Sequence, residues 1–110
     1  MQDSSLSKRR AARKKVDIDG YYNYADQWYP CKIYDLSVAG AGLKLTQVFI
    51  PGDVIRLKIG LKDNYRIVES IVANVDGQRV GIRFDLDPIM RDFLQDVMNS
   101  YHKPASLRRF

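Results

Sequence analysis

The feature that most constrains the fold of this sequence is a series of short segments in which apolar and polar residues alternate with a period of two. Segment 54–61 is the clearest: Ile55, Leu57, Ile59 and Leu61 alternate with Val54, Arg56, Lys58 and Gly60. A period of two predicts a β-strand, because successive side chains of a strand point to opposite faces. We expect further strands at about 14–24, 28–34, 41–46, 65–75 and 79–84. Turn signals such as Pro51-Gly52-Asp53 and Asp76-Gly77 separate them.

Helical spacing replaces the alternation after residue 86. Asp87 is a residue type that caps helices, and Pro88 suits the first helical position. Apolar residues then recur at spacings of three and four: Ile89, Met90, Phe93, Leu94, Val97, Met98 and Tyr101. We expect a helix at 87–102 whose apolar stripe packs against the strands. Six strands and one helix predict a small, mainly β, closed barrel with the helix across an opening, because closure removes exposed sheet edges.

Length and composition limit the classes of protein that remain. The 110 residues leave room for one domain, 1–110, with the barrel at 14–86 and a tail at 103–110. No apolar run is long enough to span a bilayer and no secretory signal is visible, so we expect a cytoplasmic protein without membrane insertion. Cys31 is expected to be a small buried residue, and His102 an exposed one at the end of the helix. We therefore expect neither a metal site nor an enzyme.

A cationic segment precedes the first strand. Six of the eight residues from 8 to 15 are Lys or Arg and none is acidic, whereas the other 102 residues carry 12 basic and 13 acidic groups. Residues 1–13 lack an apolar period and are expected to form a flexible arm. A localised cationic arm on a nearly neutral body favours one anionic ligand site over a generally basic surface.

Two motifs connect this arm to the strands. Arg9 and Arg13 form Arg-x-x-x-Arg, and Asp35, Ser37 and Gly40 form Asp-x-Ser-x-x-Gly between the second and third strands. Their order and placement resemble the bacterial PilZ domain, and segment 80–84 resembles the last-strand Gly-x-x-Phe pattern of that family. The resemblance covers about residues 8–101. It implies a split six-stranded antiparallel barrel followed by a helix, and cyclic di-GMP as the ligand, with no further cofactor.

Residue chemistry is compatible with that ligand. A guanidinium fork can donate two parallel bonds to guanine O6 and N7, or to a phosphate, and the resemblance gives these roles to Arg9 and Arg13. Asp35 can accept from guanine N1–H and the amino group, while Ser37 offers a hydroxyl. Gly40 allows close backbone approach to the ligand or a turn that a Cβ would oppose. Lys8 and Arg10 are secondary candidates, because similar proteins with an extra basic residue can hold an intercalated ligand dimer.

The resulting hypothesis is an effector whose arm becomes ordered on the dinucleotide and thereby signals to an unidentified downstream protein. Motility and exopolysaccharide synthesis are outputs known for similar proteins. Two alternatives stay open: a PilZ-like protein-interaction module without nucleotide binding, and a small barrel that binds single-stranded nucleic acid. The second would use the arm and strand aromatics, namely Tyr21, Tyr22, Tyr24, Trp28 and Tyr29. Asp35 and Ser37 could also simply hydrogen-bond the backbone of their own turn. We do not expect a nucleic-acid polymer as the partner.

Overall fold

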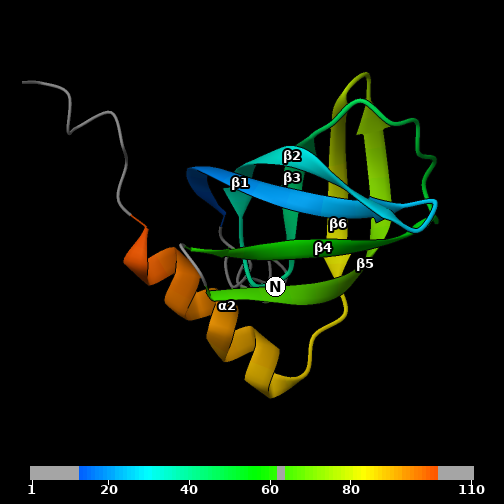
Figure 1. Ribbon diagram of the computed structural model, residues 1–110. Coiled ribbons are helices and arrows are strands. Elements are labelled where there is room, and N and C mark those ends of the chain that lie inside the picture. Colours follow the sequence, from blue (N-terminus) through cyan, green and yellow to red (C-terminus); the bar gives the residue numbers. More distant parts are fainter. Residues whose placement is uncertain (1–12, 62–63, 102–110) are drawn as a thin grey trace, which may run out of the picture.

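The computed structural model describes residues 13–61 and 64–101. Its elements are β1 (Lys14–Tyr24), β2 (Gln27–Leu36), β3 (Gly40–Lys44), β4 (Val54–Leu61), β5 (Asn64–Asp76), β6 (Arg79–Phe84) and α2 (Pro88–Ser100). The strands form a closed barrel in the order β1-β2-β3-β6-β5-β4, and every pairing is antiparallel. Figure 1 shows α2 along the lower end of this barrel. The predicted mainly β barrel with a C-terminal helix is therefore confirmed.

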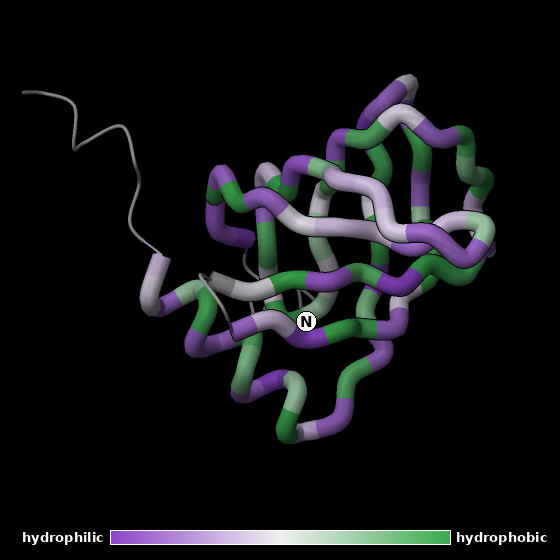
Figure 2. Tube along the Cα trace, in the orientation of Figure 1, coloured by the Kyte–Doolittle hydropathy of each residue, from purple (hydrophilic) through white to green (hydrophobic). Residues whose placement is uncertain are grey.

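The alternation read from the sequence corresponds to the inside and the outside of the barrel. In β4, Ile55, Leu57 and Ile59 are at most 1% exposed, whereas Arg56 between them points to solvent. Figure 2 shows hydrophobic and hydrophilic residues alternating along the strands. The buried side chains of all six strands meet in one core, to which α2 adds Leu94, Val97 and Met98. Burial of this core drives closure of the barrel.

Two strand boundaries differ from the sequence prediction. β2 continues to Leu36, beyond the predicted end at residue 34, and β3 covers 40–44 where 41–46 was predicted. The extension of β2 includes a β-bulge against β3, between Ile33 and Asp35, which a strict period of two does not anticipate. Pro30 pairs with Tyr21 of β1, but the register of β2 with β3 starts only at Lys32. Pro30 therefore has a strand neighbour on one side only, as an edge position requires.

The helix begins where the sequence predicts. The carboxylate of Asp87 accepts a hydrogen bond from the backbone N–H of Met90 at 2.8 Å, and Pro88 occupies the first turn. Ile89, however, is 80% exposed, so its assignment to the packing stripe was wrong. The stripe that packs on the barrel runs through Met90, Leu94 and Val97, and Ile89 lies about 100° around the helix from Met90.

Lys14, the first residue of β1, contacts the C-terminal end of α2. Its ammonium group donates to the backbone carbonyl of Met98 at 2.7 Å and lies 5.8 Å from the centroid of the Tyr101 ring. The last turn of α2 contains no basic residue of its own. Lys14 thus supplies from β1 the positive charge that favours a helix C-terminus. In the part of the chain that the structure describes, no helix is long and apolar enough to cross a membrane.

Candidate functional site

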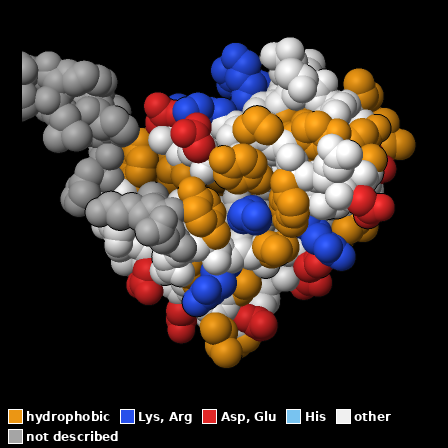
Figure 3. All heavy atoms as spheres, viewed as in Figure 1, with side chains coloured by type: hydrophobic (Ala, Val, Ile, Leu, Met, Phe, Trp, Pro, Cys, Tyr) orange, Lys and Arg blue, Asp and Glu red, His pale blue; other side chains and the backbone are white. Residues whose placement is uncertain are grey.

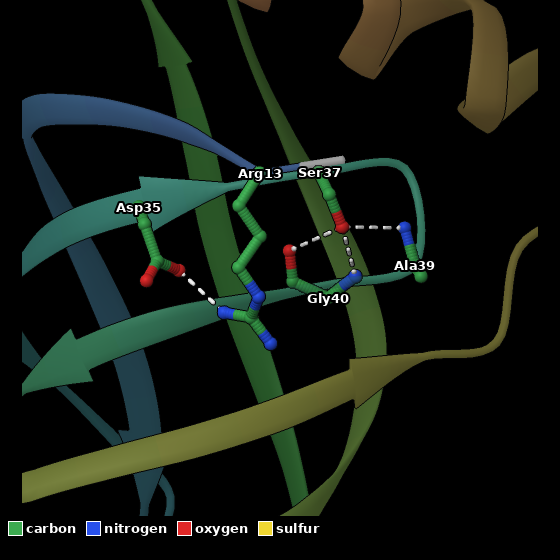
Figure 4. A network of polar contacts seen from close by, with 5 residues as sticks. All are labelled: Arg13, Asp35, Ser37, Ala39 and Gly40. Atoms are coloured by element: carbon green, nitrogen blue, oxygen red, sulfur yellow. Dashed lines mark hydrogen bonds and ion pairs between the residues drawn. The ribbon is translucent and has the colours of Figure 1, made fainter. Parts of the chain in front are cut away.

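Arg13 and Asp35, one residue from each signature motif, meet on the outer wall of the barrel, where β1 begins and β2 ends. Lys15 of β1 is paired in register with Asp35 of β2, which brings the preceding Arg13 next to that carboxylate. The guanidinium Nη1 of Arg13 donates to Oδ1 of Asp35 at 2.6 Å (Figure 4). The Arg13 side chain is 52% exposed and that of Asp35 20% exposed, so both can be reached from solvent.

The bulge in β2 is what turns Asp35 outward. Ile33 and Leu36 are both fully buried, and the two residues between them, Tyr34 and Asp35, are both half-buried on the outer face. In a regular strand, Asp35 would share the face of Ile33 and point into the core. The register shift between Ile33 and Asp35 breaks that alternation. A local irregularity therefore turns a residue that would face the core toward solvent.

Ser37 shapes the loop that follows. Its side chain is 2% exposed, and its Oγ accepts hydrogen bonds from the backbone N–H groups of Ala39 at 3.0 Å and Gly40 at 3.1 Å. The backbone N–H of Ser37 donates to the carbonyl of Gly40 at 2.9 Å, closing the turn seen in Figure 4. The sequence left open whether Asp35 and Ser37 hydrogen-bond the backbone of their own turn. In the structure Ser37 does so, whereas Asp35 pairs with Arg13.

Gly40 is required by the approach of β3 to β6. It pairs with Arg83, and a Cβ built on it would collide with the carbonyl oxygen of Ile82. Its φ angle does not lie in the left-handed region, which among the described glycines is adopted by Gly52 and Gly77. Gly40 therefore lets two strands pack closely, a reason that the motif alone did not reveal.

Three of the predicted site residues, Lys8, Arg9 and Arg10, lie outside the described residues. Of the remainder, the structure brings Arg13 and Asp35 into direct contact and places Ser37 and Gly40 in the adjoining loop. Sequence reasoning missed Tyr34 and Arg79: the guanidinium carbon of Arg79 lies 4.8 Å from the centroid of the Tyr34 ring. The spacing of three between Ile33 and Leu36, in a strand that otherwise alternates, is the signal that could have revealed the outward turn of Tyr34.

Two ionisable side chains of β2, Lys32 and Cys31, have raised pKa values. Lys32 forms ion pairs with Asp19 at 2.8 Å and Asp17 at 2.9 Å, and its hydrogen bond to Asp19 is the main reason its pKa is raised. Burial raises the pKa of the Cys31 thiol to about 12, so this buried cysteine stays protonated at neutral pH. Within residues 13–61 and 64–101, no three His, Cys, Asp or Glu side chains are grouped to hold a metal ion.

Fold and site together define a class: a small closed barrel with a polar site on its outer wall, built where the segment before β1 meets the loop from β2 to β3. The family model described as PilZ domain matches residues 7–100. The chain therefore belongs to the PilZ domain family. The Gly81-x-x-Phe84 pattern lies in β6, the last strand, as the resemblance implied.

Solved structures share this fold at low sequence identity. The PilZ domain of YcgR from Escherichia coli with c-di-GMP has a TM-score of 0.72 and 18% identity, covering 92% of this chain and 96% of that one. The PilZ domain of CeSA from a cellulose-synthesizing bacterium has a TM-score of 0.64 and 18% identity, covering 81% and 97%. No curated protein sequence matches the chain.

Longer proteins with the same fold match only in part. The PlzA protein of Borreliella burgdorferi in complex with c-di-GMP has a TM-score of 0.66 and 16% identity. The match covers 88% of this chain but 44% of PlzA. The inhibitor of motility MotI/DgrA of Bacillus subtilis has a TM-score of 0.66 and 16% identity, over 93% of this chain and 53% of that one. This chain thus spans about half the length of those two proteins.

Proposed function

We propose that this chain is a receptor for cyclic di-GMP that reports the messenger to a downstream protein. The observation that carries the proposal is the contact between Arg13 and Asp35 on the outer wall of a PilZ barrel. Two structural neighbours were solved with c-di-GMP, which supports the same ligand here. The side chains that would recognise guanine are thus already adjacent, and each carries the charge its role requires.

Ligand binding would exchange partners at this contact. Arg13 would turn its guanidinium from Asp35 to the guanine O6/N7 edge or to a phosphate, whose geometry matches the fork. Asp35 would then accept from guanine N1–H and the amino group. The loop held by Ser37 keeps the backbone beside Asp35 in one shape, so we assign Ser37 and Gly40 mainly to positioning. Arg9 would add a second fork from the arm, and Lys8 or Arg10 would serve a second ligand molecule.

Signalling would follow from ordering of the arm. Arg13 lies directly before β1, and the basic residues of segment 8–15 precede or overlap that start. Drawing Arg9 and Arg13 onto one dinucleotide would fix a segment of like charges that otherwise repel one another. The fixed arm would present a new surface to a partner. Hydrogen bonds to charged groups contribute about 1.5–3 kcal/mol each, so four or five of them, less the ordering cost, are compatible with micromolar binding.

The single-stranded nucleic-acid alternative is weakened by where the aromatic residues lie. Tyr22 is 1% exposed in the core, so its ring cannot stack on a base. On the face of β1, β4 and β5, hydrophobic side chains surround a basic group (Figure 3). The Lys58 ammonium of β4 lies 4.7 Å from the centroid of the Trp28 ring and 6.0 Å from that of Tyr21. Of the five aromatic residues named for this alternative, Tyr22 is therefore excluded.

Calorimetric titration with cyclic di-GMP tests the proposal and gives the ligand ratio. We expect Arg13→Ala to abolish measurable binding while the melting temperature of the unliganded protein barely moves. Arg56→Ala is the matched control, because Arg56 is an equally exposed arginine paired with Glu69 on another part of the barrel. Absence of binding by the unaltered protein would refute the receptor function and favour the interaction-module alternative. Tight, strongly salt-dependent binding of an oligonucleotide would instead favour the nucleic-acid alternative.

A further inference from the structure

The outer wall next to Asp35 carries a flat aromatic surface that the motifs do not include. The bulge in β2 turns Tyr34 outward together with Asp35. The Tyr34 ring crosses the neighbouring strand β3 directly over Gly42. A Cβ built on Gly42 would lie 2.6 Å from Cζ of Tyr34 and 2.9 Å from its hydroxyl oxygen. Any residue other than glycine at position 42 would therefore lift the ring away from the barrel.

Arg79 of β6 completes this surface. Its guanidinium carbon lies 4.8 Å from the centroid of the Tyr34 ring, within the range of a cation–π contact. Arg79 is exposed, and among the described residues it forms no ion pair with a carboxylate. A planar guanidinium is thus held over an aromatic ring while its charge and its N–H groups stay available to a ligand.

Two glycines, Gly42 and Gly81, leave the outer face of the barrel without side chains of their own between this surface and Asp35. Gly42 is paired with Asp35 on one side and with Gly81 of β6 on the other. A Cβ on Gly81 would lie 2.7 Å from the side-chain oxygen of Asn74. The outer face from Asp35 across β3 and β6 is therefore covered by a ring, a guanidinium and an amide, which are all planar groups. Such a surface suits a flat purine ring.

We propose that Tyr34 and Arg79 form a stacking surface for one guanine base of the ligand, beside the carboxylate of Asp35. This inference rests on the proposed function, because it names further contacts for the same dinucleotide. The base lies against the guanidinium of Arg79, which Tyr34 supports from below. Arg79 thereby contributes through its plane as well as its charge, and lysine cannot reproduce the plane.

Titration of cyclic di-GMP into three variants tests this. Tyr34→Leu keeps an apolar cover over Gly42 but removes the ring, and Arg79→Lys keeps the charge but removes the plane. We expect each to raise the Kd about tenfold or more, in line with the loss of one base–aromatic contact. Arg56→Ala is the control for charge, because it removes an exposed arginine that is paired with Glu69. It should leave the Kd unchanged. The melting temperature of the unliganded Arg79→Lys protein should equal that of the unaltered protein.

The outcomes separate this inference from the receptor function. If the unaltered protein binds the dinucleotide and Arg79→Lys binds equally well, only charge matters and the stacking surface is refuted. The same holds if Tyr34→Leu binds normally, because the ring would then only cover the glycine. If the unaltered protein does not bind at all, the receptor function fails and the stacking surface fails with it.

Discussion

Replacing Asp35 by Asn separates the binding role of this carboxylate from any role in holding the fold. The Arg13–Asp35 pair is short, at 2.6 Å, but Arg13 is 52% exposed, so solvent screens most of the attraction. Exposed ion pairs contribute about 0.2–1 kcal/mol to stability. We therefore expect Asp35→Asn to lower the free energy of unfolding by less than about 1 kcal/mol, and the melting temperature by only a few degrees.

The effect on binding should be much larger. The carboxylate would accept two hydrogen bonds from guanine, each worth about 1.5–3 kcal/mol because the acceptor is charged. The side-chain oxygen of Asn could still accept one of these hydrogen bonds. Its NH2 group, however, would face a guanine N–H group, and two donors cannot bond each other. Releasing Arg13 from its pair returns at most about 1 kcal/mol. The net loss is roughly 2 kcal/mol or more, a rise in Kd of about 30-fold.

Calorimetry with cyclic di-GMP and urea denaturation of the same samples would measure both quantities. Asp92→Asn is the matched control, because Asp92 is an exposed carboxylate on α2 without an ion pair among the described residues. It should change neither quantity. A loss of stability above about 2 kcal/mol would show that Asp35 supports the barrel and would refute the reasoning. Equal binding of an adenine analogue by the unaltered protein would refute guanine reading by the carboxylate.

Three further predictions concern the structure around the site. Gly40→Ala should lower the free energy of unfolding by about 1–3 kcal/mol, because the new Cβ meets the Ile82 carbonyl; an unchanged urea midpoint would contradict this. Lys14→Met should cost about 1 kcal/mol by removing the charge at the end of α2 while keeping an apolar stem, and equal denaturation curves would argue against that contact. Burial raises the pKa of Cys31 from 9.0 to about 12, so its contribution to stability is full below pH 9 and is lost as the pH rises toward 12. Cys31→Ala should therefore reduce the fall in melting temperature between pH 8 and pH 11, and identical falls would count against the buried thiol.

The barrel could be predicted from the sequence because the signals for its strands, turns and helix each lie within a few neighbouring residues. Alternation in 54–61, turn residues at Pro51-Gly52 and Asp76-Gly77, and the Asp87-Pro88 helix start each act within a few residues. Each matches an element boundary in the structure to within about two residues. Ile89 was misassigned because apolar spacing alone cannot tell the centre of a helical stripe from its margin.

Residues of the candidate site could be proposed from the sequence, but their geometry could not. The motifs name Arg13 and Asp35, and the pairing of β1 with β2 brings them together. The outward turn of Asp35, however, depends on a bulge between β2 and β3, and the need for glycine at position 40 depends on β6. Both are set by strands distant in the sequence. For the same reason Tyr34 and Arg79, separated by 45 positions along the chain, could not be connected before the fold was known.

The Arg13–Asp35 contact would also explain how a carboxylate can lie in the proposed site for an anionic ligand. Asp35 alone would repel the phosphates of the dinucleotide, and Arg13 at 2.6 Å would offset that charge in the protein without ligand. In the proposed complex each side chain exchanges one charge-assisted partner for another, so the exchange itself contributes little net free energy. Contacts beyond this pair, those proposed for Arg9 and for the Tyr34–Arg79 surface, would then have to add to the affinity. Loss of either member of the pair would still weaken binding, because the remaining side chain would lose its partner without gaining the ligand contacts of the other.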